Sequence, residues 1–214
     1  MESSANHYPN NIDYIEADIS KNEDRNLIFN KIEKNHIKFL IHNAAVLNPV
    51  GNILNINETD FRYHLSVNLE APLFLTQLLL PKMTNSSRIL NISSGAAYSA
   101  IPGWSAYNIS KAAFAMLYNV LKNDLSDFDI KIGSVCPGIV DTPMQEYIRS
   151  LDNKIFPQIE LFKIFKEKNK LLNPEKVAYH LFWLLLHTSN NIYIKKDWDI
   201  KEVIEMHDEV VVPA

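Results

Sequence analysis

Apolar and polar residues follow two different periods along this 214-residue chain. Segments with an apolar position every three to four residues predict helices, and short apolar runs between polar clusters predict strands. The predicted strands are 12–19, 37–46, 88–93, 130–135 and 191–200. The predicted helices are 21–34, 58–83 with Thr59 near its N-cap, 105–125, parts of 143–170, and 174–187, with 210–214 as a tail.

The order of these elements predicts an α/β fold. Strand and helix alternate throughout, as in doubly wound domains whose parallel sheet is covered by helices. The run 37–46 ends in small residues, which is typical of a strand buried on both faces. No repeat, low-complexity tract or linker divides the sequence, so residues 1–214 are predicted to form one domain.

Composition narrows the classes of function. The chain is 47% hydrophobic and 21% charged, which excludes a disordered chain. Its net charge of −4 offers no basic excess for duplex nucleic acid. The apolar runs around 73–80 and 181–186 are too short to span a bilayer, and no signal-peptide pattern opens the chain. We therefore predict a cytoplasmic protein with neither a nucleic-acid nor a membrane partner.

The rare residue types exclude several kinds of site. Cys136 is the single cysteine, so the chain has no internal disulfide and no paired-cysteine metal site, and we expect Cys136 to be a buried packing residue. The seven histidines lack the spacing of metal ligands, so we expect no metal. No two of the five glycines lie within four residues of each other, which excludes a glycine-rich phosphate loop.

Candidate chemistry begins at Tyr107 and Lys111. On a helix, positions i and i+4 share a face, which sets a phenol beside an ammonium. A tyrosine ordinarily has a pKa near ~10, and a nearby cation lowers it by stabilising the phenolate. The pair is then suited to proton transfer. A surface tyrosine and lysine on an ordinary helix are the alternative, because the spacing is common by chance.

Three predicted strands end in small or polar residues. Ser94 follows the strand 88–93, residues 136–144 follow the strand 130–135, and the sequence HNAA ends the preceding strand at 42–45. Ligands of parallel sheets lie outside the carboxyl ends of the strands, where a serine can hydrogen-bond a substrate carbonyl. Ordinary turn chemistry is the alternative. A serine-hydrolase role for Ser94 is excluded because no GxSxG elbow surrounds it.

Taken together, these motifs resemble the short-chain dehydrogenase/reductase superfamily. HNAA is similar to the NNAG element of that family, and VNLEAPLFLT resembles the segment whose active-site asparagine falls on Asn68. NISSG and YNISK resemble the catalytic serine and YxxxK pair, and PGIVDTPM resembles the loop that contacts the nicotinamide. The sequence 17–19 resembles the end of a strand whose acidic residue contacts adenine. The resemblance runs from about residue 12 to 200 and implies a Rossmann-like, three-layer α/β/α fold.

The resemblance implies a reaction and a role for each catalytic residue. It implies an NAD(P)-dependent oxidoreductase that interconverts a ketone or diketone and an alcohol by hydride transfer. Tyr107 would give a proton to the carbonyl oxygen, or remove it during alcohol oxidation, and Ser94 would orient that oxygen. Lys111 would lower the pKa of Tyr107 and hold the nicotinamide ribose. Asn68 would hold a water that passes protons to Lys111.

The implied cofactor is NADP or NAD. Thr142 and the backbone of Ile139 would hold the carboxamide, and Gly138 suits a close backbone approach. The remaining cofactor contacts implied by the resemblance are Asp18, Asn43, Ala44, Tyr107, Lys111 and Pro137.

Two later segments are similar to the benzil and sepiapterin reductase branch, which reduces aromatic diketones and pteridine ketones. They are PGIVDTPMQEYIRS and KNKLLNPEKVAYHL. Phe156, Phe162 and Phe165 lie between them and could cover an aromatic substrate or form the core face of an amphipathic helix. The lysines of 163–170 are expected to be a solvated face, with a membrane-surface role as the alternative.

The family begins with a strand, a TGxxxGxG turn, a helix and a second strand, whereas this sequence starts near the third strand. About forty to sixty residues of the pattern are absent, judged by the size of a βαβ unit. We therefore expect an N-terminally truncated sheet in which the strand at 37–41 keeps an unpaired apolar edge. Direct pairing of 12–19 with 37–41 is a further hypothesis.

Two functions remain open at this point. One is a carbonyl reductase whose N-terminal part is missing from this sequence. The other is a pseudoenzyme or partner subunit that cannot bind the dinucleotide. For either, the resemblance implies a homodimer or homotetramer formed through the helices 58–83 and 105–125, and a small-molecule carbonyl or alcohol substrate for the enzyme.

Overall fold

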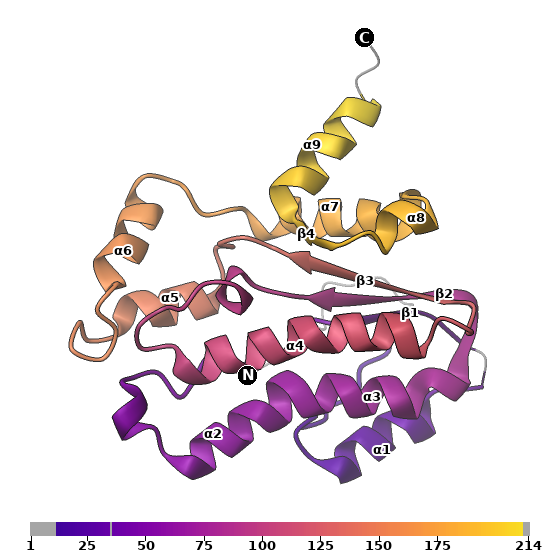
Figure 1. Cartoon of the computed structure of the whole chain (residues 1–214), viewed down its shortest axis with the longest axis horizontal. Helices are drawn as coiled ribbons and strands as arrows, with labels where there is room; N and C mark the ends of the chain where they lie inside the picture. The colour runs from indigo at the N-terminus through magenta and orange to yellow at the C-terminus, as the bar shows by residue number, and fades with distance from the viewer. Residues whose placement is uncertain (1–11, 35, 212–214) are drawn as a thin grey trace.

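The computed structural model describes residues 12–34 and 36–211. Within them, four strands form one parallel sheet of order β1-β2-β3-β4 (Figure 1). The strands are β1 (Ile37–His42), β2 (Met83–Ile92), β3 (Ile130–Cys136) and β4 (Asp197–Asp199). The parallel sheet confirms the predicted α/β class.

Helices cover both faces of this sheet and make three layers (Figure 1). One face carries α1 (Asn22–Lys31), α2 (Glu58–Leu65), α3 (Ala71–Leu79) and α4 (Ser105–Asp124). The other carries α7 (Pro174–His187), α8 (Asn190–Tyr193) and α9 (Ile200–Val211). Beyond the carboxyl ends of the strands lie α5 (Pro143–Ser150) and α6 (Ile159–Glu167). No described helix has the length and apolarity needed to cross a membrane.

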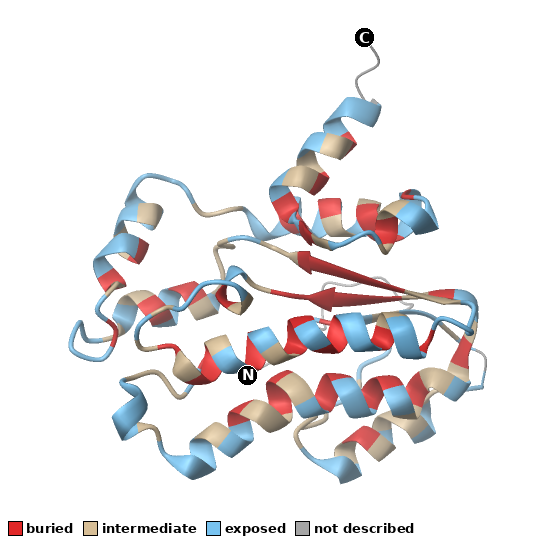
Figure 2. Cartoon of the chain, viewed as in Figure 1, coloured by how far each residue is buried: buried red, intermediate tan, exposed pale blue. Residues whose placement is uncertain are grey.

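The central strands are buried on both faces, as their apolar runs predict (Figure 2). Successive residues of β2 point to opposite sides: Ile89 packs with Phe114 of α4, and Leu90 packs with Leu184 of α7. One hydrophobic core therefore packs on each face of β2 and β3. These two cores fix the position of the carboxyl ends of both strands.

The predicted helix 58–83 is interrupted. It divides into α2, a π-helical turn (Ser66–Glu70), α3 and a 3-10 turn (Leu80–Lys82). Its N-cap is Asn57, whose side chain accepts hydrogen bonds from the N–H groups of Thr59 and Asp60, so the expectation for Thr59 is corrected by two residues. Single π turns are common at functional sites, and this one contains Asn68.

The predicted strand 12–19 is wrong. Residues 12–18 form no strand, and the chain then turns into α1. Asp18 stabilises this turn. Its backbone N–H donates to the carboxylate of Asp24, and its own carboxylate accepts hydrogen bonds from Ser20. The segment also makes no ladder with β1, which pairs only with β2 among the described residues. Alternation alone does not make a strand when no neighbour offers hydrogen bonds.

The unpaired edge of β1 is confirmed. Phe39 and Ile41 are 40% and 50% exposed, although both are apolar and β1 is flanked by β2 on its other side. The expected last strand 191–200 is observed only as β4, because the first part of that segment forms the helix α8. Residues 200–211 form α9, so positions 210 and 211 are helical rather than part of the expected tail, whose other residues lie outside those described.

Candidate active site

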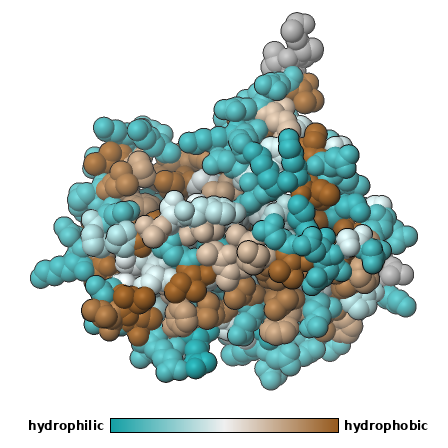
Figure 3. Space-filling model, viewed as in Figure 1, coloured by the Kyte–Doolittle hydropathy of each residue, from teal (hydrophilic) through white to brown (hydrophobic). Residues whose placement is uncertain are grey.

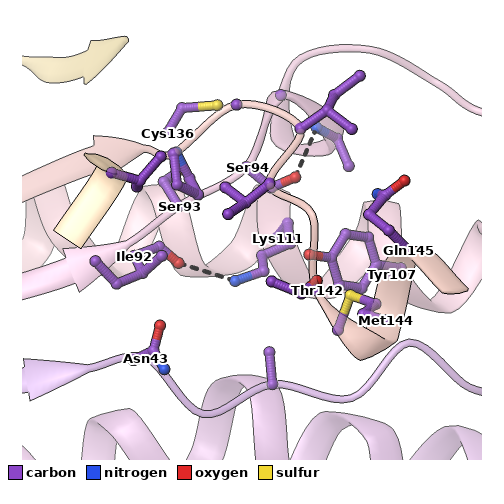
Figure 4. A pocket seen from close by; sticks show the side chains of 18 of the residues that line it. Asn43, Ile92, Ser93, Ser94, Tyr107, Lys111, Cys136, Thr142, Met144 and Gln145 are labelled. Atoms are coloured by element: carbon purple, nitrogen blue, oxygen red, sulfur yellow. Dashed lines mark hydrogen bonds between the residues drawn. The ribbon is translucent and has the colours of Figure 1, made fainter. Parts of the chain in front are cut away.

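A cavity of about 860 Å³ lies at the carboxyl ends of β1, β2 and β3 (Figure 4). Its floor comes from the residues that follow these three strands, and its walls from α4, α5 and α7. Of the eleven predicted site residues, nine line it: Asn43, Ala44, Ser94, Tyr107, Lys111, Pro137, Gly138, Ile139 and Thr142. Asp18 and Asn68 do not.

Tyr107 and Ser94 meet at the wall formed by α4. The first turn of α4 carries Tyr107, which is buried, while Ser94 lies two residues after β2 and accepts a hydrogen bond from the N–H of Ala96. Burial raises the pKa of Tyr107, and the nearby Ser94 hydroxyl lowers it by less. The net pKa of Tyr107 is therefore raised, opposite to the direction expected from a neighbouring cation alone.

Lys111 lies one turn after Tyr107 and is buried. Its Nζ donates to the carbonyl oxygen of Ile92 at 2.9 Å and lies 5.7 Å from the centre of the Tyr107 ring (Figure 4). Burial lowers the pKa of Lys111 to about 8, against the opposing charges of Cys136 and Asp197. Lys111 can therefore exchange a proton close to neutral pH.

Asn68 is buried behind the cavity rather than in its wall. Its Oδ1 accepts from the N–H of Val46 and its Nδ2 donates to the carbonyl oxygen of Val46, both at 2.8 Å. The π turn thus ties the chain that follows β1 to the helical layer.

His64 and Ser110 join Asn68 in one buried network that the sequence analysis missed. His64 Nδ1 lies 2.7 Å from the carbonyl oxygen of Asn48, so Nδ1 carries the proton and Nε2 accepts. Nε2 faces Asn68 Nδ2 at 2.9 Å and Ser110 Oγ at 2.8 Å. Burial lowers the pKa of His64, which keeps the ring neutral. The spacing in the sequence could have indicated that these two side chains are neighbours, because His64 precedes Asn68 by one helical turn.

The loop after β3 needs a glycine at its bend. Gly138 has a φ of +72°, and a Cβ there would lie 3.1 Å from Leu172 Cδ1. Thr142 then precedes α5 as its N-cap residue. Cys136, expected to be a buried packing residue, is instead only half-buried and lines the cavity.

Aromatic side chains form the wall beside Tyr107. Trp104 stacks on Phe156 with ring centres 5.3 Å apart and lies 5.6 Å from Phe162. Phe156 and Phe162 are buried, so the core alternative is correct for both, although Phe162 also lines the cavity. Phe165 is half-buried against Phe162. Packing among these rings therefore fixes the aromatic surface beside the cavity.

Two expectations about charged groups are resolved. The carboxylate of Asp18 bonds to Ser20 and faces Lys21, so the structure does not bring it to the cavity. Lys163 and Lys166 lie at the surface and pair with Glu160 and Asp141. Across residues 12–34 and 36–211, no three histidine, cysteine or acidic side chains gather as metal ligands.

Comparisons with known proteins agree with this geometry. The family model described as short chain dehydrogenase matches residues 1–153. The benzil reductase ((S)-benzoin forming) of Bacillus subtilis is 34% identical over 170 residues, which cover 77% of this chain and 69% of that protein. The Bacillus cereus enzyme of the same description is 34% identical over 144 residues, covering 65% of this chain and 58% of that protein.

The crystal structure of the short chain dehydrogenase/reductase YIR035C from Saccharomyces cerevisiae superposes with a TM-score of 0.79 at 27% identity. The superposition covers 88% of this chain and 77% of that structure. The fold, the ordered strand ends and the family match lead to one conclusion. The chain belongs to the short chain dehydrogenase family.

Proposed function

We propose that this chain carries the reaction site of an NAD(P)-dependent oxidoreductase that interconverts a carbonyl compound and an alcohol. The observation that carries the proposal is the convergence of Ser94, Tyr107 and Lys111 on one cavity at the carboxyl ends of the strands. A buried phenol, a buried amine and a serine hydroxyl that line the same cavity make a proton-transfer site facing a volume large enough for a small molecule.

In this proposal, the Ser94 and Tyr107 hydroxyls both donate hydrogen bonds to the oxygen of the bound carbonyl. The Tyr107 hydroxyl gives its proton to that oxygen as negative charge develops there, and it takes the proton back when an alcohol is oxidised. Lys111, with its pKa near 8, holds a charge that favours the tyrosinate left after transfer. Asn68 binds the backbone of Val46 and so holds in place the segment after β1 that lines the cavity.

The described residues fit the nicotinamide end of the cofactor. Gly138 leaves backbone free of a side chain at the cavity, and Thr142 and Lys111 offer hydrogen-bond donors beside it. None of the five glycines forms a phosphate-binding turn at a helix N-terminus within the part of the chain that the structure describes. When bound, NADP or NAD supplies the hydride. Which of the two binds depends on contacts that lie outside this cavity.

For the substrate, we propose an aromatic ketone or diketone. Trp104 and Phe162 present aromatic surface to the cavity next to Tyr107. Such walls favour flat apolar molecules through stacking and burial. The benzil reductases that this chain resembles act, by their description, on an aromatic diketone.

The test is titration of the chain with NADPH and with NADH, followed by nucleotide fluorescence and by thermal shift. We expect saturable binding and then nucleotide oxidation on addition of benzil. Tyr107→Phe, which removes only the proton donor, should keep binding and lose turnover about 100-fold or more. Equal turnover by Tyr107→Phe would refute the assignment of Tyr107.

A second candidate is a partner subunit of the same fold that does not bind the dinucleotide. It is favoured by one observation, namely that the described residues contain no glycine-rich turn for the pyrophosphate. A folded sample that binds neither nucleotide but associates with itself or with a longer relative would favour this candidate over the reductase.

A further inference from the structure

The loop that follows Ser94 has little core packing of its own. After the 3-10 turn Gly95–Ala97, residues 98–100 are exposed, and Ala96 is the one buried side chain before residue 101. Yet Ser94 at the start of this loop must keep a fixed position in the cavity lining if it is to act with Tyr107 on the same oxygen. Something other than apolar burial has to hold the loop against α4.

Asn108, the residue after Tyr107, makes that attachment. Its Nδ2 donates to the carbonyl oxygens of Ala96 and Ser99, both at 2.6 Å. Its Oδ1 accepts from the backbone N–H of Ile101 at 3.1 Å. Three hydrogen bonds from one half-buried side chain therefore span the whole loop and join it to the first turn of α4.

An asparagine is specifically suited to this position. Both amide hydrogens are used on carbonyl oxygens and the amide oxygen is used on an N–H, so the side chain is almost fully satisfied. Aspartate has the same shape but no hydrogens to donate, and it would place negative charge against two carbonyl oxygens. Alanine would leave three backbone groups without these partners.

The far side of the loop has a second attachment. The Tyr98 hydroxyl donates to Asp197 Oδ2 of β4 at 2.8 Å. Since Asp197 lies beside Ser134 in the sheet, the loop is fixed to β4 as well as to α4. The Asn108 bonds are the ones that set the loop relative to Tyr107, because both residues lie on the same helical turn.

We propose that Asn108 is a positioning residue for the reaction, which holds the loop 95–101 so that the Ser94 hydroxyl stays beside Tyr107 in the lining of the cavity. The inference rests on the proposed function, because it assigns Ser94 and Tyr107 to the same carbonyl oxygen. It predicts that loss of Asn108 acts through Ser94 rather than through general stability.

The ionisation of Tyr107 reports on this placement of Ser94 directly. The titratable groups facing Tyr107 are Lys111 on its own helix, His64 from α2 and Cys136 from the end of β3. None of them is bonded to Asn108. Because the nearby Ser94 hydroxyl lowers the pKa of Tyr107, loosening the loop should raise that pKa.

The experiment is a double-mutant cycle on Asn108→Ala and Ser94→Ala, with Asn108→Asp as the isosteric variant. The matched control is Asn119→Ala on α4, whose Nδ2 donates only to Ala115 within the helix. We expect each of the first three variants to lower kcat for benzil reduction about 10–100-fold, with little change in the KM for nucleotide. The double variant should be no slower than Ser94→Ala, and Asn119→Ala should be unchanged.

A second measurement needs no cofactor. The absorbance of tyrosinate is titrated in each variant and in its Tyr107→Phe counterpart, and the difference gives the ionisation of Tyr107. Asn108→Ala and Ser94→Ala should raise the pKa of Tyr107 by the same amount, and the double variant by no more. Additive effects in the cycle, or an unchanged Tyr107 titration in Asn108→Ala, would overturn the inference. If nucleotide oxidation is absent, only the proposed function fails, and the titration still decides the role of Asn108.

Discussion

His42 stands at the carboxyl end of β1, buried, with Nε2 2.8 Å from Thr76 Oγ. Burial lowers the pKa of His42 from the ordinary 6.5 to about 4. The folded protein therefore keeps the ring neutral, while the unfolded chain takes up a proton below pH 6.5. The contribution of His42 to the free energy of unfolding is fully present above pH 6.5. It is lost as the pH falls towards about 4.

The size of this effect follows from the same pKa difference. Each pH unit inside the window costs about 1.4 kcal/mol, so His42 should remove about 2 kcal/mol between pH 6.5 and pH 5. Urea unfolding at several pH values measures it. His42→Gln should flatten the dependence of the free energy of unfolding on pH. Equal slopes in wild type and His42→Gln would contradict the assignment.

Residues with a motif were easy to predict, and their supporting partners were not. Ser94, Tyr107 and Lys111 stand at fixed spacings on a strand end and a helix, so local geometry brings them together. His64 reaches Ser110 across 46 positions, and its role depends on how α2 packs on α4. Asp18 does not line the cavity, and residues 12–18 do not form the strand at whose end the resemblance placed it.

At the scale of elements, α8 shows tertiary packing overriding a strand pattern. Tyr193 lies with its ring on the backbone of β3 at Gly133, and its hydroxyl donates to the carbonyl oxygen of Ile89 at 2.8 Å. The apolar residues of 191–194 looked like a strand because they are buried, but they are buried from a short helix that lies on the sheet. The helix α9 was missed for a related reason, because its buried side depends on α7.

The same contact makes a prediction about stability. A Cβ on Gly133 would lie 2.6 Å from Tyr193 Cε2, so Gly133→Ala must push α8 off the sheet. We expect a loss of about 1–3 kcal/mol in the free energy of unfolding, measured by urea denaturation. Gly95→Ala is the control, since nothing lies within 4 Å of a Cβ there. Comparable losses in both variants would show that Tyr193 does not occupy this space.

At the scale of the whole molecule, two of the exposed apolar surfaces bear on how the chain could associate. One is the free edge of β1 with Phe39 and Ile41, where the sheet stops among the described residues. The other is the outward face of α2, α3 and α4, over which Figure 3 shows hydrophobic residues gathered. Its exposed members include Tyr63, Phe74, Ile109, Met116 and Val120. Contiguous apolar surface of this kind is typical of an interaction site.

We propose that two copies associate through this helical face, because α4 presents the apolar side chains of Ile109, Met116 and Val120 along its exposed length. Met116 is 61% exposed, and a charge there would have to be buried in the interface. Met116→Glu should therefore shift the protein from dimer or tetramer to monomer in light scattering coupled to size exclusion. Phe182→Glu, at a position 53% exposed on α7, should leave the assembly intact. A monomeric wild type, or an unchanged mass for Met116→Glu, would place the contact between copies elsewhere or remove it.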